Sequence, residues 1–427
     1  MELVVNPSRL TGAVSIPGSK SQTIRAVAIG ALASGRSRIE SPLVSADTLA
    51  AVDAYCALGA AIERLDDACW EVEGTGGQLS APSDVIDVRN SGTTLRIAVG
   101  SGALLNEGQA VFTGDAQVRR RPIGPLLQSL NDLGASADST CNNGCAPVVV
   151  SGRLRGGSTR IEAVSSQYLT SLLINCPLAD GASEILVPVL NEQPYVHMTL
   201  DWLTRCGIAL ERDELRWFRI PGGQRYSAFD RRIPADFSSA TFFLGAGVLS
   251  DNDVLVQGLD FNDPQGDKAV VDYLEQLGAR ITQEAEGLRI RPGELTGCEL
   301  DLNATPDALP MMAVVGCFAR GRTVLANVPQ ARLKETDRIA VMAAELGRMG
   351  ARITERPDGL VIEQSELHAA HVDGHDDHRV VMALAVAASS VPGTTRIRTA
   401  EAIQVTFPTF VQCMTELGGN LHLDTAD

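Results

Sequence analysis

The chain has 427 residues, 44% of them hydrophobic, and is therefore long enough for two hydrophobic cores and too long for one typical domain. A formal net charge of −16 argues against a nucleic acid or an anionic membrane as the main partner. The nine cysteines are odd in number and scattered, unlike a disulfide framework. The first residues lack signal-peptide and transit-peptide character, and no apolar run is long enough to span a membrane, so we expect a cytoplasmic protein.

The first distinctive element is the helix start at residues 17–25, Pro-Gly-Ser-Lys-Ser-Gln-Thr-Ile-Arg. Ser19 or Ser21 can cap this helix, and Lys20 and Arg25 lie in its first turns. A helix start presents free N–H groups and a partial positive charge, which suits an anion and disfavours cationic side chains. The segment is therefore either a surface turn with two solvated charges or part of an anion site.

A repeat of about 72 residues runs through the whole chain. A predicted helix end, a glycine and an alternating strand recur with glycines at positions 59, 134, 207, 278, 350 and 418, which are 68 to 75 residues apart. Each copy is predicted to form strand, helix, strand, helix and a strand pair such as Arg280–Thr282 and Gly287–Arg291. Six copies in this length predict an α/β protein of two domains with three copies each.

The chain is expected to cross between these domains twice. A polar, Arg-rich segment at Tyr226–Pro234 lies near the midpoint, and a second crossing is expected near Val14–Pro17. The prediction is therefore a discontinuous domain of residues 1–16 and 235–427, and an inserted domain of residues 17–234.

The first helix start of each copy carries residues that capping alone does not require. Ser, Asn and Asp at these positions are ordinary caps, but Lys20, Gln167 and the His378-Arg379 pair are not. The second helix starts concentrate basic residues at 119–122 and 332–338. If the helix starts of a domain share one face, they form a cationic site for small anions that carry phosphate or carboxylate.

Two helix starts with acidic or basic residues can be interpreted more closely. Lys334, Glu335 and Arg338 lie in the approach and first turns of an amphipathic helix, where two cations at the positive helix end suggest a neutralising anionic ligand. Asp307 follows Pro306 at another helix start and is either an N-cap or a carboxylate placed to deprotonate a hydroxyl.

Two other patterns are discounted. The Gly-Ser-Lys-Ser sequence at 18–21 lacks the glycine spacing of a P-loop. The cluster of His368, His371, His375 and His378 has no cysteine and no helical His pair with a nearby Glu, so we expect no metal site.

The motifs together resemble one family over essentially the whole chain. They are Pro17-Gly-Ser-Lys-Ser with Arg25, Asn90-Ser-Gly-Thr-Thr-Leu-Arg96, Arg121-Pro-Ile-Gly124, Ser165-Ser-Gln-Tyr-Leu169, Lys334-Glu-Thr-Asp-Arg338 and Asp377-His-Arg379. In this order and at these intervals they resemble the 5-enolpyruvylshikimate-3-phosphate (EPSP) synthases, the enolpyruvyl transferases of the shikimate pathway and of aromatic amino acid biosynthesis. The resemblance implies a two-domain inside-out α/β barrel, each domain with three βαβαββ repeats, that closes on ligands between the domains.

The resemblance also implies an activity. The enolpyruvyl group of phosphoenolpyruvate is transferred to the 5-hydroxyl of shikimate 3-phosphate by addition and elimination through a tetrahedral intermediate, with release of phosphate. Asp307 is the expected base, and Glu335 and Lys20 are the expected proton donors or relays. No metal or organic cofactor is implied, and we expect a monomer.

The motifs assign residues to each substrate. Those expected to bind shikimate 3-phosphate are Lys20, Ser21, Arg25, Ser165, Ser166, Gln167, Tyr195, Asp307 and Lys334. Those expected to bind phosphoenolpyruvate are Lys20, Asn90, Gly92, Arg121, Gln167, Arg338, His378 and Arg379.

Three positions depart from the family pattern. Glu192 stands where Ser is usual, and its carboxylate would repel a phosphate unless it is paired. Gln330 replaces a frequent Asn, and Val405 replaces a frequent Lys on the phosphoenolpyruvate side. The alternatives are a relative that acts on another shikimate-like acceptor, a UDP-N-acetylglucosamine enolpyruvyl transferase and a non-catalytic repeat scaffold. The second usually carries a loop cysteine that residues 119–122 lack, and the scaffold would have lost Lys20 and Asp307.

Overall fold

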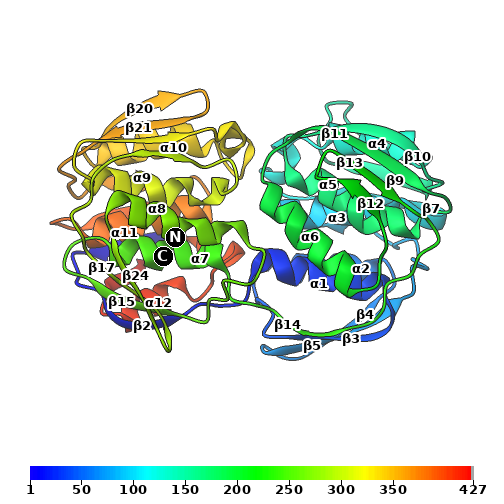
Figure 1. Cartoon of the computed structure of the whole chain (residues 1–427), viewed down its shortest axis with the longest axis horizontal. Helices are drawn as coiled ribbons and strands as arrows, with labels where there is room; N and C mark the ends of the chain where they lie inside the picture. Colours follow the sequence, from blue (N-terminus) through cyan, green and yellow to red (C-terminus); the bar gives the residue numbers. More distant parts are fainter. Residues whose placement is uncertain (425–427) are drawn as a thin grey trace. The chain divides into compact units, whose positions relative to one another are not determined.

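The computed structural model describes residues 1–424, and the chain divides into two compact units (Figure 1). Unit 1 contains Met1–Pro17 and the chain from Ala235 onward, and unit 2 contains Gly18–Pro234. The boundaries between the units therefore follow Pro17 and Pro234.

All six sheets of the described chain follow one plan. The first strand is parallel to the second, and the third and fourth strands are antiparallel to their neighbours. In unit 2 the sheets are β14(Asp230–Arg232)-β3(Ser34–Glu40)-β5(Cys69–Thr75)-β4(Ala61–Asp66), β6(Ile86–Asp87)-β7(Leu104–Thr113)-β9(Val148–Arg153)-β8(Ser136–Ser139) and β10(Gly157–Ala163)-β11(Ser183–Leu190)-β13(Trp217–Ile220)-β12(Glu211–Asp213). In unit 1 they are β2(Thr11–Ser15)-β15(Asp253–Gln257)-β17(Gly287–Arg291)-β16(Arg280–Glu284), β18(Glu299–Asp301)-β19(Arg322–Ala326)-β21(Gly359–Glu363)-β20(Arg352–Arg356) and β22(His371–Asp373)-β23(Thr395–Arg398)-β1(Glu2–Asn6)-β24(Asn420–Asp424).

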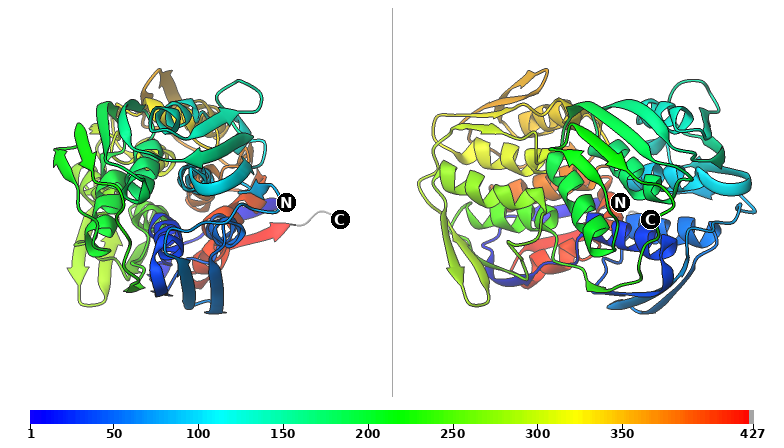
Figure 2. Two further views of the ribbon diagram at one scale, coloured as in Figure 1. Left: turned by 90° about the vertical axis from the view of Figure 1, so that its right-hand side faces the viewer. Right: turned by 45° about the vertical axis from the view of Figure 1, so that its right-hand side comes forward.

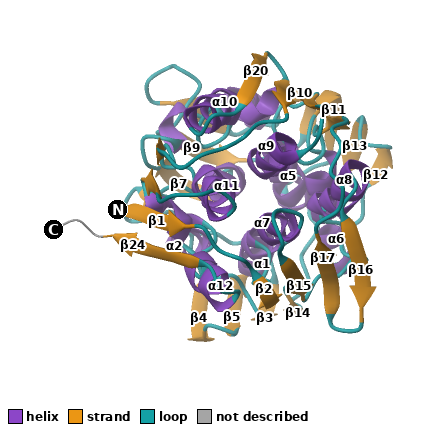
Figure 3. Cartoon of the chain, turned by 90° about the vertical axis from the view of Figure 1, so that its left-hand side faces the viewer, coloured by secondary structure: helices purple, strands orange, loops and turns teal. Residues whose placement is uncertain are grey.

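Three buried helices pack against one another inside each unit. In unit 2 they are α1 (Lys20–Leu32), α3 (Gly92–Gly102) and α5 (Ser166–Asn175), and in unit 1 they are α7 (Phe237–Gly247), α9 (Leu309–Phe318) and α11 (His378–Ser389). α7 and α9 are apolar or small around their whole circumference, which is the pattern of a buried helix, and the other four carry their charged or large polar residues mainly in the first turns. Figure 3 shows α7, α9 and α11 with the sheets of unit 1 around them, so the predicted inside-out α/β fold is confirmed.

The second helix of each repeat has one buried face. These helices are α2 (Ala46–Ala57), α4 (Gly124–Asp132), α6 (Gln193–Arg205), α8 (Ala269–Leu277), α10 (Arg338–Arg348) and α12 (Phe410–Glu416). Each ends at one of the six repeated glycines, whose φ angles lie between 82° and 104°. A side chain is strained in this left-handed region, so the helix-end glycines predicted from the sequence are confirmed.

At each of the two crossings, a strand that belongs to one unit is followed directly by a helix of the other unit. The chain runs from β2 of unit 1 into α1 of unit 2, and from β14 of unit 2 into α7 of unit 1. The N-terminal strand β1 completes the last sheet by pairing with β23 and β24, and Figure 2 shows this blue strand beside the red final one.

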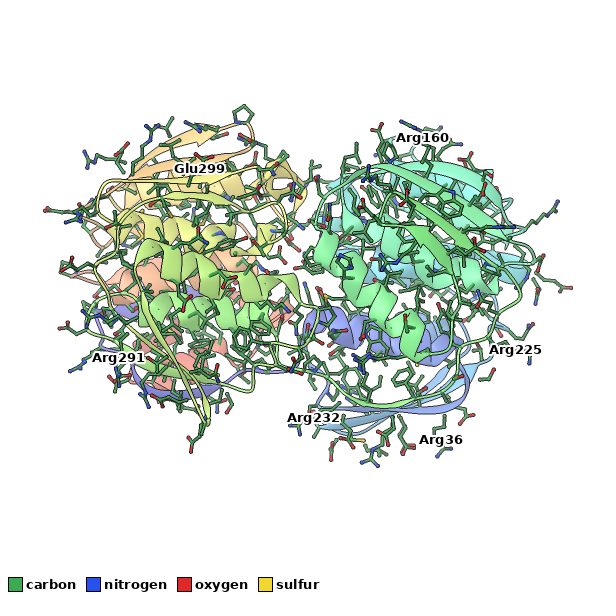
Figure 4. The ribbon with its side chains drawn as sticks, in the orientation of Figure 1. Arg36, Arg160, Arg225, Arg232, Arg291 and Glu299 are labelled. Atoms are coloured by element: carbon green, nitrogen blue, oxygen red, sulfur yellow. The ribbon has the colours of Figure 1, made fainter. Side chains whose placement is uncertain are left out.

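The outer faces of the sheets carry charged side chains. Arg36 of β3, Arg160 of β10 and Arg291 of β17 point away from their ribbons in Figure 4, and all three are exposed. Arg36 pairs with Glu71 and Glu73 of β5, each at 3.2 Å. Such exposed pairs add little stability, about 0–1 kcal/mol each, so the buried helix faces provide most of the stabilisation.

Candidate active site

In unit 2, the start of α1 holds a buried cation. The Ser19 hydroxyl caps the helix by accepting from the backbone N–H of Gln22. Lys20 is the first helical residue, and its Nζ lies 3.1 Å from Oδ2 of Asp47 in the first turn of α2. The two side chains are 12% and 4% exposed. The interpretation of Lys20 as a solvated surface charge is therefore wrong.

Arg25, a little more than one turn along α1, is buried among neutral oxygens. Its guanidinium donates to the hydroxyls of Thr170 and Thr199 and to the backbone oxygens of Ser21 and Tyr195, at 2.9–3.3 Å. Burial lowers the pKa of Arg25 to about 10, although Tyr195 opposes this shift. Because none of these partners is a carboxylate, a bound anion would stabilise the buried charge.

The start of α3 is covered by a second guanidinium. A Cβ atom at Gly92 would overlap Nη1 of Arg121, so only glycine allows this approach. Arg96 lies beside it and donates to the backbone oxygen of Gly92 at 3.2 Å. Asn90, just before the helix, donates to Asp115 and to Gln117, both at 2.6 Å.

The start of α5 carries polar side chains and a carboxylate. The hydroxyl of Ser165 accepts from the backbone N–H of Gln167, whose own side chain donates to Thr93 of α3 at 3.1 Å. The carboxylate of Glu192 accepts from both the backbone N–H and the hydroxyl of Ser166. The starts of α1 and α3 in unit 2 thus carry cationic side chains, whereas the start of α5 carries a carboxylate.

In unit 1, Asp307 is the centre of an ion-pair cluster. It lies in the 3₁₀ turn Pro306–Ala308 before α9 and does not cap that helix, so the capping interpretation is wrong. Its oxygens lie 2.7 Å from Arg338, 2.9 Å from Arg379 and 4.0 Å from Lys334. Arg379 also donates to Ser238 of α7 at 2.6 Å and contacts Nε2 of His378.

Arg338 is fully buried and is neutralised within the chain. Its Nη2 lies 2.6 Å from Glu335 and its Nε 2.7 Å from Asp377, in addition to the pair with Asp307. Burial would lower the pKa of Arg338, but these carboxylates outweigh burial and raise it. The neutralising ligand expected for Arg338 is therefore replaced by protein carboxylates, and its predicted contact with phosphoenolpyruvate would require one of them to be exchanged.

The cations around Asp307 set its protonation. Burial would raise the pKa of this carboxyl, but Arg379, Lys334 and Arg338 outweigh burial and hold the pKa below its ordinary value. Because the folded pKa is lower than the unfolded value of about 3.9, the ionised carboxylate stabilises the fold above that pH. We expect the free energy of unfolding to fall as pH drops below about 4, and less steeply in Asp307→Asn. Chemical denaturation between pH 3 and 6 measures the slope, and identical slopes would contradict this assignment.

The structure thus gathers the candidate residues in two sets, one in each unit. Sequence reasoning did not assign Asp47, Asp377 or Ser238 to the site. Asp377 is the N-cap of α11 and Ser238 lies in the first turn of α7, so both occur at helix starts that the repeat had marked. Their contacts with Arg338 and Arg379 depend on side chains from different repeats, which spacing alone does not reveal.

Residues 1–424 contain neither a membrane-spanning helix nor a cluster of metal-binding side chains. No helix of this part of the chain is long and apolar enough to cross a membrane. No group of three or more histidine, cysteine, aspartate or glutamate side chains in it is arranged to hold a metal ion.

The fold and the helix starts define a class of repeat α/β proteins with largely buried cations at the helix starts of each unit. A family model described as EPSP synthase (3-phosphoshikimate 1-carboxyvinyltransferase) matches residues 4–414, and the chain belongs to this family.

Relatives and solved structures agree with this. The chain is 54% identical over 421 residues to the 3-phosphoshikimate 1-carboxyvinyltransferase of Acetivibrio thermocellus, covering 99% of both chains. It is 49% identical over 423 residues to that of Ruminiclostridium cellulolyticum, covering 99% of this chain and 100% of the relative. The EPSP synthase structure from Acinetobacter baumannii superposes with a TM-score of 0.83 at 26% identity, covering 99% of this chain and all of the other.

Proposed function

We propose that this chain is a 3-phosphoshikimate 1-carboxyvinyltransferase in aromatic amino acid biosynthesis. It transfers the enolpyruvyl group of phosphoenolpyruvate to the 5-hydroxyl of shikimate 3-phosphate and releases phosphate. Family membership and the names of the curated relatives support this activity over a related transferase with another acceptor. The observation that carries the mechanism is the buried Asp307 carboxylate surrounded by Lys334, Arg338 and Arg379.

The first step is proton removal from the acceptor. Without substrates, Asp307 is a weak base because the cations hold its pKa down. Anionic groups of the substrates would pair with Lys334 and Arg379 and weaken their hold on Asp307. Its pKa would rise, and it could then accept the proton of the 5-hydroxyl as the oxygen attacks the enol carbon.

The second requirement is a proton for C3 of phosphoenolpyruvate. Lys20 and Glu335 are the proposed donors or relays, and each is held by an ion pair, with Asp47 and Arg338 respectively. One of these groups then takes a proton back from C3 of the tetrahedral intermediate as phosphate leaves by C–O cleavage, which re-forms the C=C bond of the enolpyruvyl group. Buried guanidinium and ammonium groups stabilise the phosphate and carboxylate charges, because such groups act strongly where water is excluded.

The proposed substrate contacts follow the residue types. Ser21, Arg25, Ser165, Ser166, Gln167 and Tyr195 of unit 2, with Asp307 and Lys334 of unit 1, bind shikimate 3-phosphate. Asn90, Gly92 and Arg121 of unit 2, with Arg338, His378 and Arg379 of unit 1, bind phosphoenolpyruvate, and Lys20 and Gln167 contact both substrates. We propose that the protein acts as a cytoplasmic monomer and needs no cofactor.

Phosphate release tests the activity directly. The protein is mixed with shikimate 3-phosphate and phosphoenolpyruvate, and inorganic phosphate is measured against mixtures that lack one substrate. Release that requires both substrates is expected. Folded protein that releases no phosphate above background would overturn the proposal.

Val405 offers a further test on the phosphoenolpyruvate side. It is the half-buried last residue of the 3₁₀ helix Ala400–Val405, at a position where family members often carry Lys. Adding a cation there is expected to lower KM for phosphoenolpyruvate several-fold, because a phosphate or carboxylate gains a charge-assisted contact. Steady-state kinetics of Val405→Lys, with the exposed neighbour Gln404→Lys as control, measure this. An unchanged KM would show that the missing Lys does not weaken binding.

A further inference from the structure

Glu192 is a buried carboxylate in an unusual position. It is 2% exposed and directly precedes α6, and its φ of 57° lies in the left-handed region that favours glycine. Its side chain makes no cap hydrogen bond to α6. Instead, Oε2 accepts from the backbone N–H of Ser166 at 3.2 Å and from the Ser166 hydroxyl at 2.8 Å. The carboxylate thus lies on the first turn of α5.

This contact is not needed to cap α5, because the Ser165 hydroxyl already accepts from the backbone N–H of Gln167. A non-glycine residue in the left-handed region is strained, and burying a carboxylate adds a desolvation cost. Glu192 bears both costs and gains the charge-assisted hydrogen bonds of a helix N terminus. It therefore acts as an internal anion for the first turn of α5.

The equivalent helix starts of unit 2 show what is unusual here. Lys20 stands at the start of α1, and Arg121 covers Gly92 at the start of α3. Both starts carry a cationic side chain, and that of Lys20 pairs with Asp47. At α5 the backbone N–H and the hydroxyl of Ser166 already donate to a carboxylate, so a second anion would have to compete with Glu192 for these donors.

We propose that Glu192 sets the acceptor specificity of the enzyme by occupying, with its own carboxylate, the anion position at the N terminus of α5. This inference rests on the proposed function, in which Ser165 and Ser166 contact shikimate 3-phosphate. A phosphate at these serines must displace the carboxylate of Glu192 or lie beside it against charge repulsion. A neutral hydroxyl in the same place can donate a hydrogen bond to the carboxylate instead.

The consequence is a reduced preference for the phosphorylated acceptor. Selectivity is the ratio of kcat/KM for shikimate 3-phosphate to kcat/KM for shikimate, each measured with phosphoenolpyruvate. Glu192→Ser removes the internal anion and supplies a hydroxyl donor. We expect this variant to raise the ratio at least tenfold, mainly through a lower KM for shikimate 3-phosphate, with kcat little changed.

Matched variants separate charge from size. Glu192→Gln keeps the shape but removes the charge, and is expected to raise the ratio in the same direction by a smaller factor. Glu184→Ser removes an exposed glutamate of β11 and is expected to leave the ratio unchanged. Thermal unfolding checks that each variant is folded, and the Gln variant tests the inference if the Ser variant does not fold.

Binding without turnover gives an independent measurement. Calorimetric titration of the wild type and Glu192→Ser with shikimate 3-phosphate, and separately with shikimate, should show tighter binding of the phosphorylated ligand alone in the variant. An unchanged or lower selectivity ratio in an active, folded variant would overturn the role of Glu192. If instead neither wild type nor variants release phosphate with either acceptor, the proposed function itself fails.

Discussion

Lys20→Met is expected to lower kcat by about 10³-fold while leaving the fold intact. The ammonium group stands at the N terminus of α1, largely buried and oriented by Asp47. Methionine keeps the length of the side chain but can neither carry charge nor transfer a proton. Loss of one charge-stabilising donor costs about 10²–10³ in rate, and loss of a general acid costs about 10²–10⁴. Steady-state phosphate release measures the change.

A second substitution separates chemistry from stability. Lys20→Met leaves Asp47, which is 4% exposed, without its cation, so some loss of unfolding free energy is expected as well. The double variant Lys20→Met/Asp47→Asn removes the stranded charge and should regain stability without regaining turnover. Lys268→Met, which removes an ammonium group that donates to two backbone oxygens, is the control. A folded Lys20→Met enzyme with kcat within tenfold of the wild type would refute the catalytic role.

The repeat architecture could be predicted because its signals are local. A glycine at a helix end reports a left-handed backbone, and its recurrence counts the repeats. The strand pair predicted at Arg280–Thr282 and Gly287–Arg291 is present, with the first strand two residues longer. The two crossings were predicted, but the parallel pairing of β2 with β15 and of β14 with β3 was not, because strand partners in different repeats leave no trace in local periodicity.

In the candidate site, too, the local features could be predicted and the contacts between distant segments could not. Lys20, Gln167 and Arg379 could be identified as candidates because they stand at helix starts, where capping does not require these residue types. Sequence alone could not show that Asp47 pairs with Lys20, or that Arg338 is neutralised by carboxylates. Those contacts join side chains from different segments of the chain, and only packing brings them together.

Arg338→Met is expected to have the largest effect on stability. The guanidinium is fully buried and joins Asp307, Glu335 and Asp377, which come from three different segments of unit 1. Its removal leaves three carboxylates close together without their shared cation. Breaking a buried pair in this way costs about 3–5 kcal/mol of unfolding free energy. For a unit of this size, that lowers Tm by roughly 10 °C. Differential scanning calorimetry measures the shift against Arg356→Met, an exposed arginine of β20.

The pH dependence identifies the cause of that loss. Asp307 keeps Arg379 and Lys334 in this variant, but Glu335 and Asp377 lose a buried cationic partner, and burial then disfavours their charged forms. A raised carboxyl pKa favours the fold at low pH and disfavours it as pH rises through that value. The Tm deficit of Arg338→Met relative to wild type should therefore shrink between pH 7 and pH 5. A deficit that stays constant over this range would mean that lost packing, and not unpaired charge, destabilises the variant.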